Sequence, residues 1–180
     1  MDLTEKRLSS RSVYEGLIVD VHMDEVSLPN GKTSRREVVE HPGGVVILPL
    51  DSQMRVITVK QYRYAMGQMM TELPAGKLEK GEKADPAAAA LRELREEIGA
   101  IPASFIPLGM LHSSPGIFTE TLYLYLARDL TFEDPEPDED EFLEIERVPF
   151  DILVQRIMNG EITDAKTVAA VLKAKVRLHL

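Results

Sequence analysis

The chain contains no cysteine. This absence excludes a disulfide framework, a thiolate metal site and a cysteine nucleophile, and it is typical of proteins in the reducing cytoplasm. Long apolar runs are also missing, because the longest, within residues 43–50, is far shorter than the roughly 20 residues of a membrane-spanning helix. The first ten residues have no apolar core, so we expect no signal peptide. We therefore expect a cytoplasmic protein that does not enter a membrane.

Basic residues are in the minority, with 21 Lys and Arg against 30 Asp and Glu and a net charge of −9. This sign argues against binding to nucleic acid or to anionic lipid. Nine acidic residues and no basic residue lie between positions 133 and 146, and the rest of the chain carries equal numbers of acidic and basic residues. Because prolines at 135 and 137 interrupt this acidic run, we expect it to form an exposed loop.

The length of 180 residues and the 44% of hydrophobic side chains fit a single domain with one sizeable core. Hydrophobic patterns and turn signals predict strands over residues 12–27, 35–40, 45–50, 56–64, 122–127 and 142–148, and helices over residues 87–98, 150–158 and 163–178. A turn at residues 29–32 joins the first two strands into a small antiparallel sheet. Mixed strands and helices predict an α/β or α+β sandwich.

The helix expected near residue 87 has the clearest boundaries. Asp85 is suited to cap it, Pro86 to occupy its first position, and Gly99 to end it. At 100° per residue, one stripe of this helix is apolar, and we expect it to face the core. That stripe consists of Ala87, Leu91, Leu94 and Ile98.

Three carboxylates, Glu93, Glu96 and Glu97, share an arc of about 100° beside this stripe. Like charges at such spacing cost about 0.2–0.5 kcal/mol per pair, so a cation should compensate them. One interpretation is a solvated helix face neutralised by Arg92 and Arg95. The other is a site for Mg²⁺, which prefers carboxylate oxygens and retains waters for substrate phosphates. The preceding loop, residues 72–82 with two glycines, favours the metal because it allows close backbone approach.

Residues 76–100 resemble the Nudix box, a motif of the Nudix hydrolase family. The matching residues are Gly76, Glu82, Arg92–Glu93–Leu94, Glu96–Glu97 and Gly99–Ala100. One spacing differs, because nine residues separate Glu82 from Arg92 where the motif has seven. The helical spacing from Arg92 to Gly99 is intact, so we expect the two extra residues in the loop ahead of the helix.

The resemblance implies that box glutamates hold Mg²⁺, with Mn²⁺ as the alternative ion. It implies metal ligation by Glu93 and Glu97, ligation or water support by Glu96, and a backbone ligand in the carbonyl of Ala75. The same resemblance gives Gly76, Glu82 and Arg92 structural roles, with Glu82 pairing with Arg92.

Residues outside the box resemble the ADP-ribose pyrophosphatases of this family. The resemblance implies substrate contacts from Arg36, Arg63, Ser114, Pro115, Gly116 and Glu120. It also implies that the acidic loop supplies a glutamate that activates the attacking water. Glu139 and Glu141 are the candidates, and we favour Glu139 narrowly because Glu141 abuts the following strand.

The expected activity is hydrolysis of ADP-ribose to AMP and ribose 5-phosphate by a protein with an α/β/α sandwich and a mixed sheet. Residues 1–42 would form an antiparallel region that pairs two subunits, and residues 43–180 the catalytic core. Two alternatives stay open: a nucleoside diphosphate sugar hydrolase of broader specificity, and a non-catalytic sensor of ADP-ribose.

Overall fold

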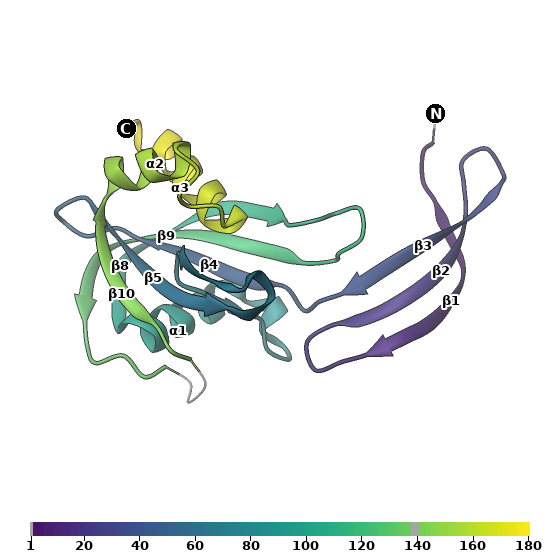
Figure 1. Cartoon of the computed structure of the whole chain (residues 1–180), viewed down its shortest axis with the longest axis horizontal. Coiled ribbons are helices and arrows are strands. Elements are labelled where there is room, and N and C mark those ends of the chain that lie inside the picture. The colour runs from purple at the N-terminus through teal and green to yellow at the C-terminus, as the bar shows by residue number, and fades with distance from the viewer. Residues whose placement is uncertain (1, 138–140) are drawn as a thin grey trace. The chain divides into compact units, whose positions relative to one another are not determined.

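The computed structural model describes residues 2–137 and 141–180, so Glu139 lies outside the described part of the chain (Figure 1). The chain divides into two compact units. Unit 1 comprises Met1–Gly43 and His112–Thr121, and unit 2 comprises Gly44–Leu111 and Leu122–Leu180.

Unit 1 contains a three-stranded antiparallel sheet in the order β1 (Lys6–Glu15), β2 (Asp20–Ser27) and β3 (Thr33–Glu40). The single strand predicted over residues 12–27 is wrong, because a turn divides it. The amide of Gly16 donates to the carbonyl of Val19 at 3.1 Å and to Asp20 Oδ1 at 3.2 Å. Leu17 and Ile18 occupy this turn and are exposed, so its composition did not indicate a turn.

The remainder of unit 1 is the segment between strand β8 (Ala100–His112) and strand β9 (Thr121–Phe132). Its residue Ile117 accepts a hydrogen bond from the amide of Val39 at 2.8 Å, and Thr119 donates to the carbonyl of Val39 at 3.0 Å. These bonds fix the segment against the end of β3. Ser114–Gly116 therefore lies in the same unit as the N-terminal sheet.

Unit 2 contains two sheets. The first is mixed, in the order β7 (Ala75–Lys77), β4 (Gly44–Pro49), β9 (Thr121–Phe132) and β8 (Ala100–His112), with β4 and β9 parallel. The second is antiparallel, in the order β10 (Glu144–Pro149), β5 (Arg55–Arg63) and β6 (Gln68–Glu72). The strands predicted over residues 45–50, 56–64, 122–127 and 142–148 correspond to β4, β5, β9 and β10.

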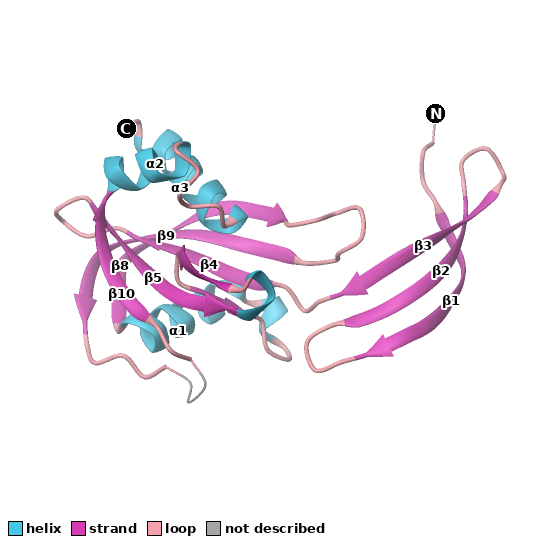
Figure 2. Ribbon diagram, viewed as in Figure 1, coloured by secondary structure: helices cyan, strands magenta, loops and turns pink. Residues whose placement is uncertain are grey.

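Strand β4 supplies side chains to two hydrophobic cores. Val45 and Ile47 belong to the cluster that contains Leu94 of α1 (Pro86–Ile98). Val46 and Leu48 belong to the cluster built with α2 (Phe150–Met158) and α3 (Ala165–Leu178). Figures 1 and 2 show α1 on one side of these strands and α2 with α3 on the other. The predicted α/β/α sandwich with a mixed sheet is confirmed.

The predicted helix boundaries also agree with the structure. Asp85 caps α1 by accepting from the amide of Ala88 at 3.2 Å, and Gly99 ends it with a φ of 64°. Helix α2 has the predicted bounds, and α3 begins at Ala165 after an Asp164 cap. No helix of the described residues is both long and apolar enough to cross a membrane.

The face of α1 that packs into the protein differs from the prediction. Leu91 is 39% exposed, whereas Glu93 and Glu97 are buried together with Leu94 and Ile98. The helical projection at 100° per residue placed these glutamates beside the apolar stripe. It identified the buried face from apolar side chains alone, and such a pattern cannot show that a carboxylate is buried. The solvated-face interpretation is therefore wrong for Glu93 and Glu97.

Candidate active site

Strand β7 brings its main chain against two box glutamates. A Cβ on Gly76 would overlap the carboxylate of Glu93, so a side chain at this position would displace that carboxylate. The backbone amide of Ala75 hydrogen-bonds the carboxylate of Glu97. Because β7 pairs with the buried strand β4, this short strand is a rigid support for both carboxylates.

Burial makes the charges of these glutamates costly. The residues Glu93 and Glu97 are only 8% and 3% exposed. Burial raises the pKa of Glu93 to about 7, with a further rise from the charge of Glu96 and an opposing effect of Arg92. Burial, followed by the charges of Glu141 and Glu93, raises the pKa of Glu97 well above its ordinary value. The Oε2 atom of Glu97 has no hydrogen-bond partner among the described residues.

Arg92 binds the outer carboxylates of the box. Its Nε and Nη2 atoms donate to the two oxygens of Glu82 at 3.1 and 3.2 Å, and its Nη1 donates to Glu96 at 2.7 Å. Its Nη2 also lies 2.9 Å from Glu93 Oε1. Burial opposes the charge on Arg92, but the hydrogen bond with Glu82 and the charge of Glu93 raise its pKa overall.

The expected pairing of Glu82 with Arg92 is therefore present despite the two extra residues. Glu82 begins a short 3-10 helix, η2 (Glu82–Ala84), and its carboxylate also accepts from the amide of Glu79 at 2.7 Å. The hydrogen bond from Arg92 lowers the pKa of Glu82. The longer loop thus retains the contact that the standard spacing would provide.

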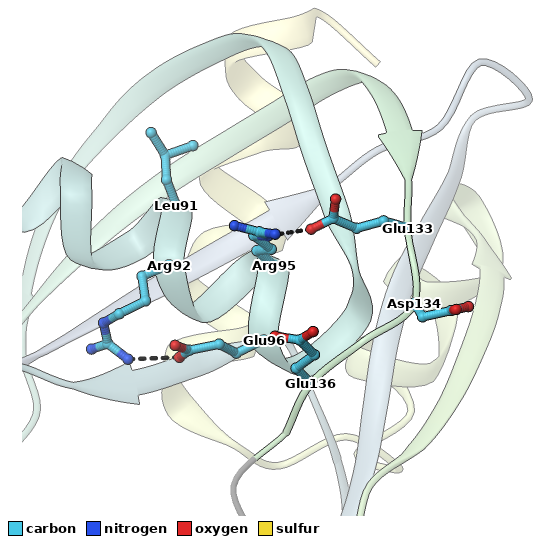
Figure 3. A pocket seen from close by; sticks show the side chains of 7 residues that line it. All are labelled: Leu91, Arg92, Arg95, Glu96, Glu133, Asp134 and Glu136. Atoms are coloured by element: carbon cyan, nitrogen blue, oxygen red, sulfur yellow. Dashed lines mark hydrogen bonds and ion pairs between the residues drawn. The ribbon is translucent and has the colours of Figure 1, made fainter.

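The box residues fit a divalent cation, although the described residues form no ready cluster of three His, Asp or Glu ligands. Glu93 and Glu96 both pair with the guanidinium of Arg92, and Figure 3 shows the pair with Glu96. Mg²⁺ is commonly bound by one or two carboxylates together with water and substrate phosphates. The Oε2 atom of Glu97, which no described residue contacts by a hydrogen bond, and the glycine beside Glu93 suit this form of binding.

The acidic loop returns to these carboxylates at Glu141. The charge of Glu141 raises the pKa of both Glu93 and Glu97, so it lies within electrostatic range of the pair. Glu139, the other candidate for activating water, lies outside the described residues.

Arg63 at the end of β5 binds a buried carboxylate that the sequence interpretation missed. Its Nε and Nη2 donate to the two oxygens of Glu72, both at 2.7 Å, and Lys166 pairs with the same carboxylate. Glu72 is 1% exposed, but hydrogen bonds from Arg63 and the charge of Lys166 outweigh its burial and lower its pKa. The side chain of Arg63 stays 40% exposed, which leaves it accessible to a ligand.

Helix α3 supports the same region through a second buried contact. The hydroxyl of Thr167 accepts from the amide of Leu73 at 2.9 Å and donates to Asp164 at 2.6 Å. Leu73 lies two residues before Ala75, so this contact holds the chain that leads into β7. The Glu72–Leu73–Pro74 sequence could have suggested Glu72, but no local pattern indicates Lys166 or Thr167.

The remaining predicted substrate residues gather in unit 1. Arg36, Pro115 and Gly116 line one cleft of about 490 Å³, and Ser114 begins the turn beside it by accepting from Phe118 at 2.9 Å. Arg36 donates to both oxygens of Glu5, at 3.0 and 2.5 Å. Glu120 lies 3.6 Å from Nδ1 of His41. Arg36 and the Ser-Pro-Gly loop thus share one unit, while the box, Arg63 and Glu141 share the other.

Comparisons with known proteins indicate the family of this chain. The NUDIX domain family matches residues 40–171, and the nucleoside diphosphate sugar hydrolase N-terminal domain matches residues 5–39. The ADP-ribose pyrophosphatase of Bacillus subtilis is 39% identical over 94% of this chain and 91% of its own length. A Bacillus methanolicus protein named methanol dehydrogenase activator is 40% identical over 93% of this chain and 90% of its own.

A solved structure has the same fold as this chain. The crystal structure of an ADP compounds hydrolase superposes with a TM-score of 0.85 at 23% identity, covering 99% of this chain and 97% of that one. Together with the box geometry, the domain match over most of the chain shows that this protein belongs to the Nudix family of hydrolases.

Proposed function

We propose that the protein hydrolyses the pyrophosphate bond of ADP-ribose to give AMP and ribose 5-phosphate, with Mg²⁺ as its ion and Mn²⁺ as the alternative. The observation that carries this proposal is the buried pair of Glu93 and Glu97, held against Gly76 and Ala75, because burial raises the pKa of both even though Arg92 pairs with Glu93. Relatives named ADP-ribose pyrophosphatase, 39% and 36% identical, support the choice of substrate.

The chain's own residues would bind the ion and orient the reacting groups. Glu93 and Glu97 are the proposed main ligands, assisted by Glu96 and the carbonyl of Ala75, while Arg92 holds the outer carboxylates in place. A bound divalent cation cancels diphosphate charge and lowers the pKa of a coordinated water. Water attacks one phosphorus atom, the bridging P–O bond breaks, and a loop glutamate accepts the proton from the water.

The other predicted residues would contact the substrate. We assign the diphosphate to Arg63, because its exposed guanidinium is oriented by Glu72 and interacts electrostatically with Glu97. We assign further substrate contacts to Arg36, Ser114, Pro115, Gly116 and Glu120. The proton acceptor would be Glu139 or Glu141.

A substrate panel tests the proposed activity. We expect kcat/KM for ADP-ribose to exceed that for ADP-glucose and for nucleoside triphosphates by about tenfold or more, since a pocket that binds the leaving sugar discriminates by differential binding. At saturating Mg²⁺, the measurement is phosphate release after addition of a phosphatase for ADP-ribose and ADP-glucose, and direct chromatographic quantification of the products for the triphosphates, which the phosphatase itself would hydrolyse. Higher efficiency on a nucleoside triphosphate would refute the assignment to ADP-ribose.

The same panel separates the two other functions. A nucleoside diphosphate sugar hydrolase of broad specificity would cleave several nucleotide sugars with similar efficiency, and the match of residues 5–39 favours this candidate. A sensor would bind ADP-ribose without cleaving any compound of the panel. The buried Glu93 and Glu97 favour turnover over sensing, because their burial is costly without a metal.

We also propose that the protein is a cytoplasmic homodimer of single Nudix domains, with residues 1–42 as the dimerisation region and 43–180 as the catalytic core. All ten residues of β1 are exposed, including the apolar side chains of Leu8, Val13 and Tyr14. A group of exposed apolar side chains on one sheet marks an interaction surface, so we expect a second subunit to cover them.

Light scattering at micromolar concentration tests the dimer. We expect a mass of about twice the 20.1 kDa of one chain. Val13→Glu should shift the protein toward the monomer, since it places a charge in the covered surface, whereas Lys32→Glu in the β2–β3 turn should not. A monomeric wild type would contradict the proposal.

A further inference from the structure

Lys166 lies in the first turn of α3, where its charge is unfavourable. The helix begins at Ala165 after the Asp164 cap, and its first turn contains no acidic residue. The N–H groups at the start of a helix carry partial positive charge, so a cation is disfavoured there. The side chain of Lys166 is nevertheless only 14% exposed. A cation held in this position needs negative partners.

Two carboxylates supply that negative charge. The Nζ atom of Lys166 donates to Oδ1 of Asp164 at 3.0 Å and also to Oε2 of Glu72. Asp164 is itself fixed, since its Oδ2 accepts from the amide of Thr167 at 3.0 Å and from the hydroxyl of the same residue at 2.6 Å. Glu72 is the last residue of β6 and is buried. Lys166 therefore joins the start of α3 to a buried carboxylate at the end of a strand.

The carboxylate of Glu72 also orients Arg63. Its Oε1 accepts from Nε of Arg63 and its Oε2 from Nη2, both at 2.7 Å. Two parallel hydrogen bonds fix the plane of a guanidinium, which a single bond does not. They use two of its five N–H groups and leave three for a ligand. Because this side chain is 40% exposed, a ligand in solution can reach it.

The main chain beside Glu72 is held to the same helix. The amide of Leu73 donates to Oγ1 of Thr167 at 2.9 Å, one residue along from Lys166. Both ends of the contact between Lys166 and Glu72 therefore start from a fixed backbone. Without Lys166, the carboxylate of Glu72 would keep Arg63 as its side-chain partner among the described residues, and the two groups could shift together.

We propose that Lys166 is a positioning residue for substrate binding: it holds the carboxylate of Glu72, which in turn orients the guanidinium of Arg63 for the diphosphate. This inference rests on the proposed function, in which Arg63 binds the diphosphate. Lys166 acts through Glu72 because its ammonium group binds the two carboxylates. A lysine that only stabilised the fold would have no effect specific to Arg63.

Lys166→Met tests this role, because methionine is of similar length and carries no charge. We expect KM for ADP-ribose to rise about tenfold and kcat to change less than threefold, since binding that is equal in the ground state and the transition state affects KM alone. Lys166→Arg keeps the positive charge and should restore most of the affinity. Lys173→Met, at an exposed position of the same helix, is the matched control and should keep the wild-type KM. A wild-type KM in Lys166→Met would overturn the proposal.

A double-mutant cycle with Arg63→Met separates positioning from general destabilisation. The readout is the Kd of ADP-ribose, measured by calorimetry in EDTA so that it does not depend on hydrolysis. We expect Lys166→Met to weaken binding about tenfold when Arg63 is present and less than twofold in the Arg63→Met background. Equal weakening in both backgrounds, or no measurable binding by the wild type, would overturn the proposal.

A second variant covers the case in which Lys166→Met does not fold. Lys166→Met combined with Asp164→Asn removes one charge of each sign and keeps a capping side chain at the start of α3. We expect the same tenfold weakening, and wild-type affinity in this variant would overturn the proposal.

The proposed function and the positioning role fail separately. If the wild type cleaves no compound of the panel but the cycle shows coupling, hydrolysis is refuted and the role of Lys166 stands. If the wild type cleaves ADP-ribose but the cycle shows no coupling, only the role of Lys166 is refuted.

Discussion

Glu97→Gln and Glu93→Gln are each expected to reduce turnover of ADP-ribose by at least about 100-fold while leaving the fold intact. Removing a group that only supports a metal ligand costs up to about 100-fold, so removing a ligand itself should cost at least as much. Glutamine keeps the size of the side chain, and both positions lie in a helix whose capping residues are untouched. The loss should persist at saturating Mg²⁺ for Glu97, whose Oε2 has no other partner among the described residues.

The same substitutions should stabilise the metal-free protein. Burial raises the pKa of Glu93 from 4.5 to about 7, so the folded chain holds a proton that the unfolded chain releases. Stability of the wild type therefore falls as the pH rises from 4.5 to about 7, and the full penalty is present above that range. In Glu93→Gln this pH-dependent fall should be smaller, and the melting temperature at pH 8 in EDTA should be higher than that of the wild type.

Two measurements check this result: activity across a Mg²⁺ titration, and melting curves in EDTA between pH 5 and pH 8. Glu79→Gln is the matched control, since its side chain is exposed on the loop before the helix. We expect this control to keep wild-type activity and melting behaviour. Wild-type turnover in either box variant would show that the glutamates are not metal ligands.

Local sequence signals predicted the box helix correctly, because its boundaries depend on nearby residues. Asp85, Pro86 and Gly99 act within one turn of the helix, and the structure confirms all three. The buried face could not be predicted in the same way. Glu93 and Glu97 are buried because β7 lies against them, and a strand of only three residues gives no hydrophobic pattern.

Contacts between distant residues were beyond the sequence interpretation. Glu72 pairs with Lys166, which is 94 residues away, and Leu73 bonds to Thr167 at the same separation. Strand β8 was missed as well, since Pro102, Pro107 and Gly109 interrupt its pattern. These elements depend on tertiary packing, so a local pattern carries little information about them. The pairing of Glu82 with Arg92 was predicted through a motif, and the structure shows that a longer loop still permits it.

The second large effect concerns the glutamate that accepts the proton. A general base contributes typically about 10²–10⁴ in rate, and it can be carried on a loop that reaches the water in the reactive complex. We expect Glu139→Gln to lower kcat at least tenfold with little change in Mg²⁺ affinity, because this residue is not a proposed ligand. Glu141→Gln must be measured beside it, since the charge of Glu141 raises the pKa of both Glu93 and Glu97.

The two variants distinguish a proton acceptor from a charge that only repels. If Glu139 accepts the proton, Glu141→Gln should reduce electrostatic repulsion at the box, and its Mg²⁺ dependence should change more than its kcat. If Glu141 accepts the proton, it should show the larger loss in kcat. Glu136→Gln is the control in the same run of acidic residues, because Glu136 is not a candidate proton acceptor and the substitution keeps its backbone amide, which donates to the carbonyl of Glu96. Equal kcat in all three variants would leave water activation to the metal and the box carboxylates, and would refute a proton acceptor in this loop.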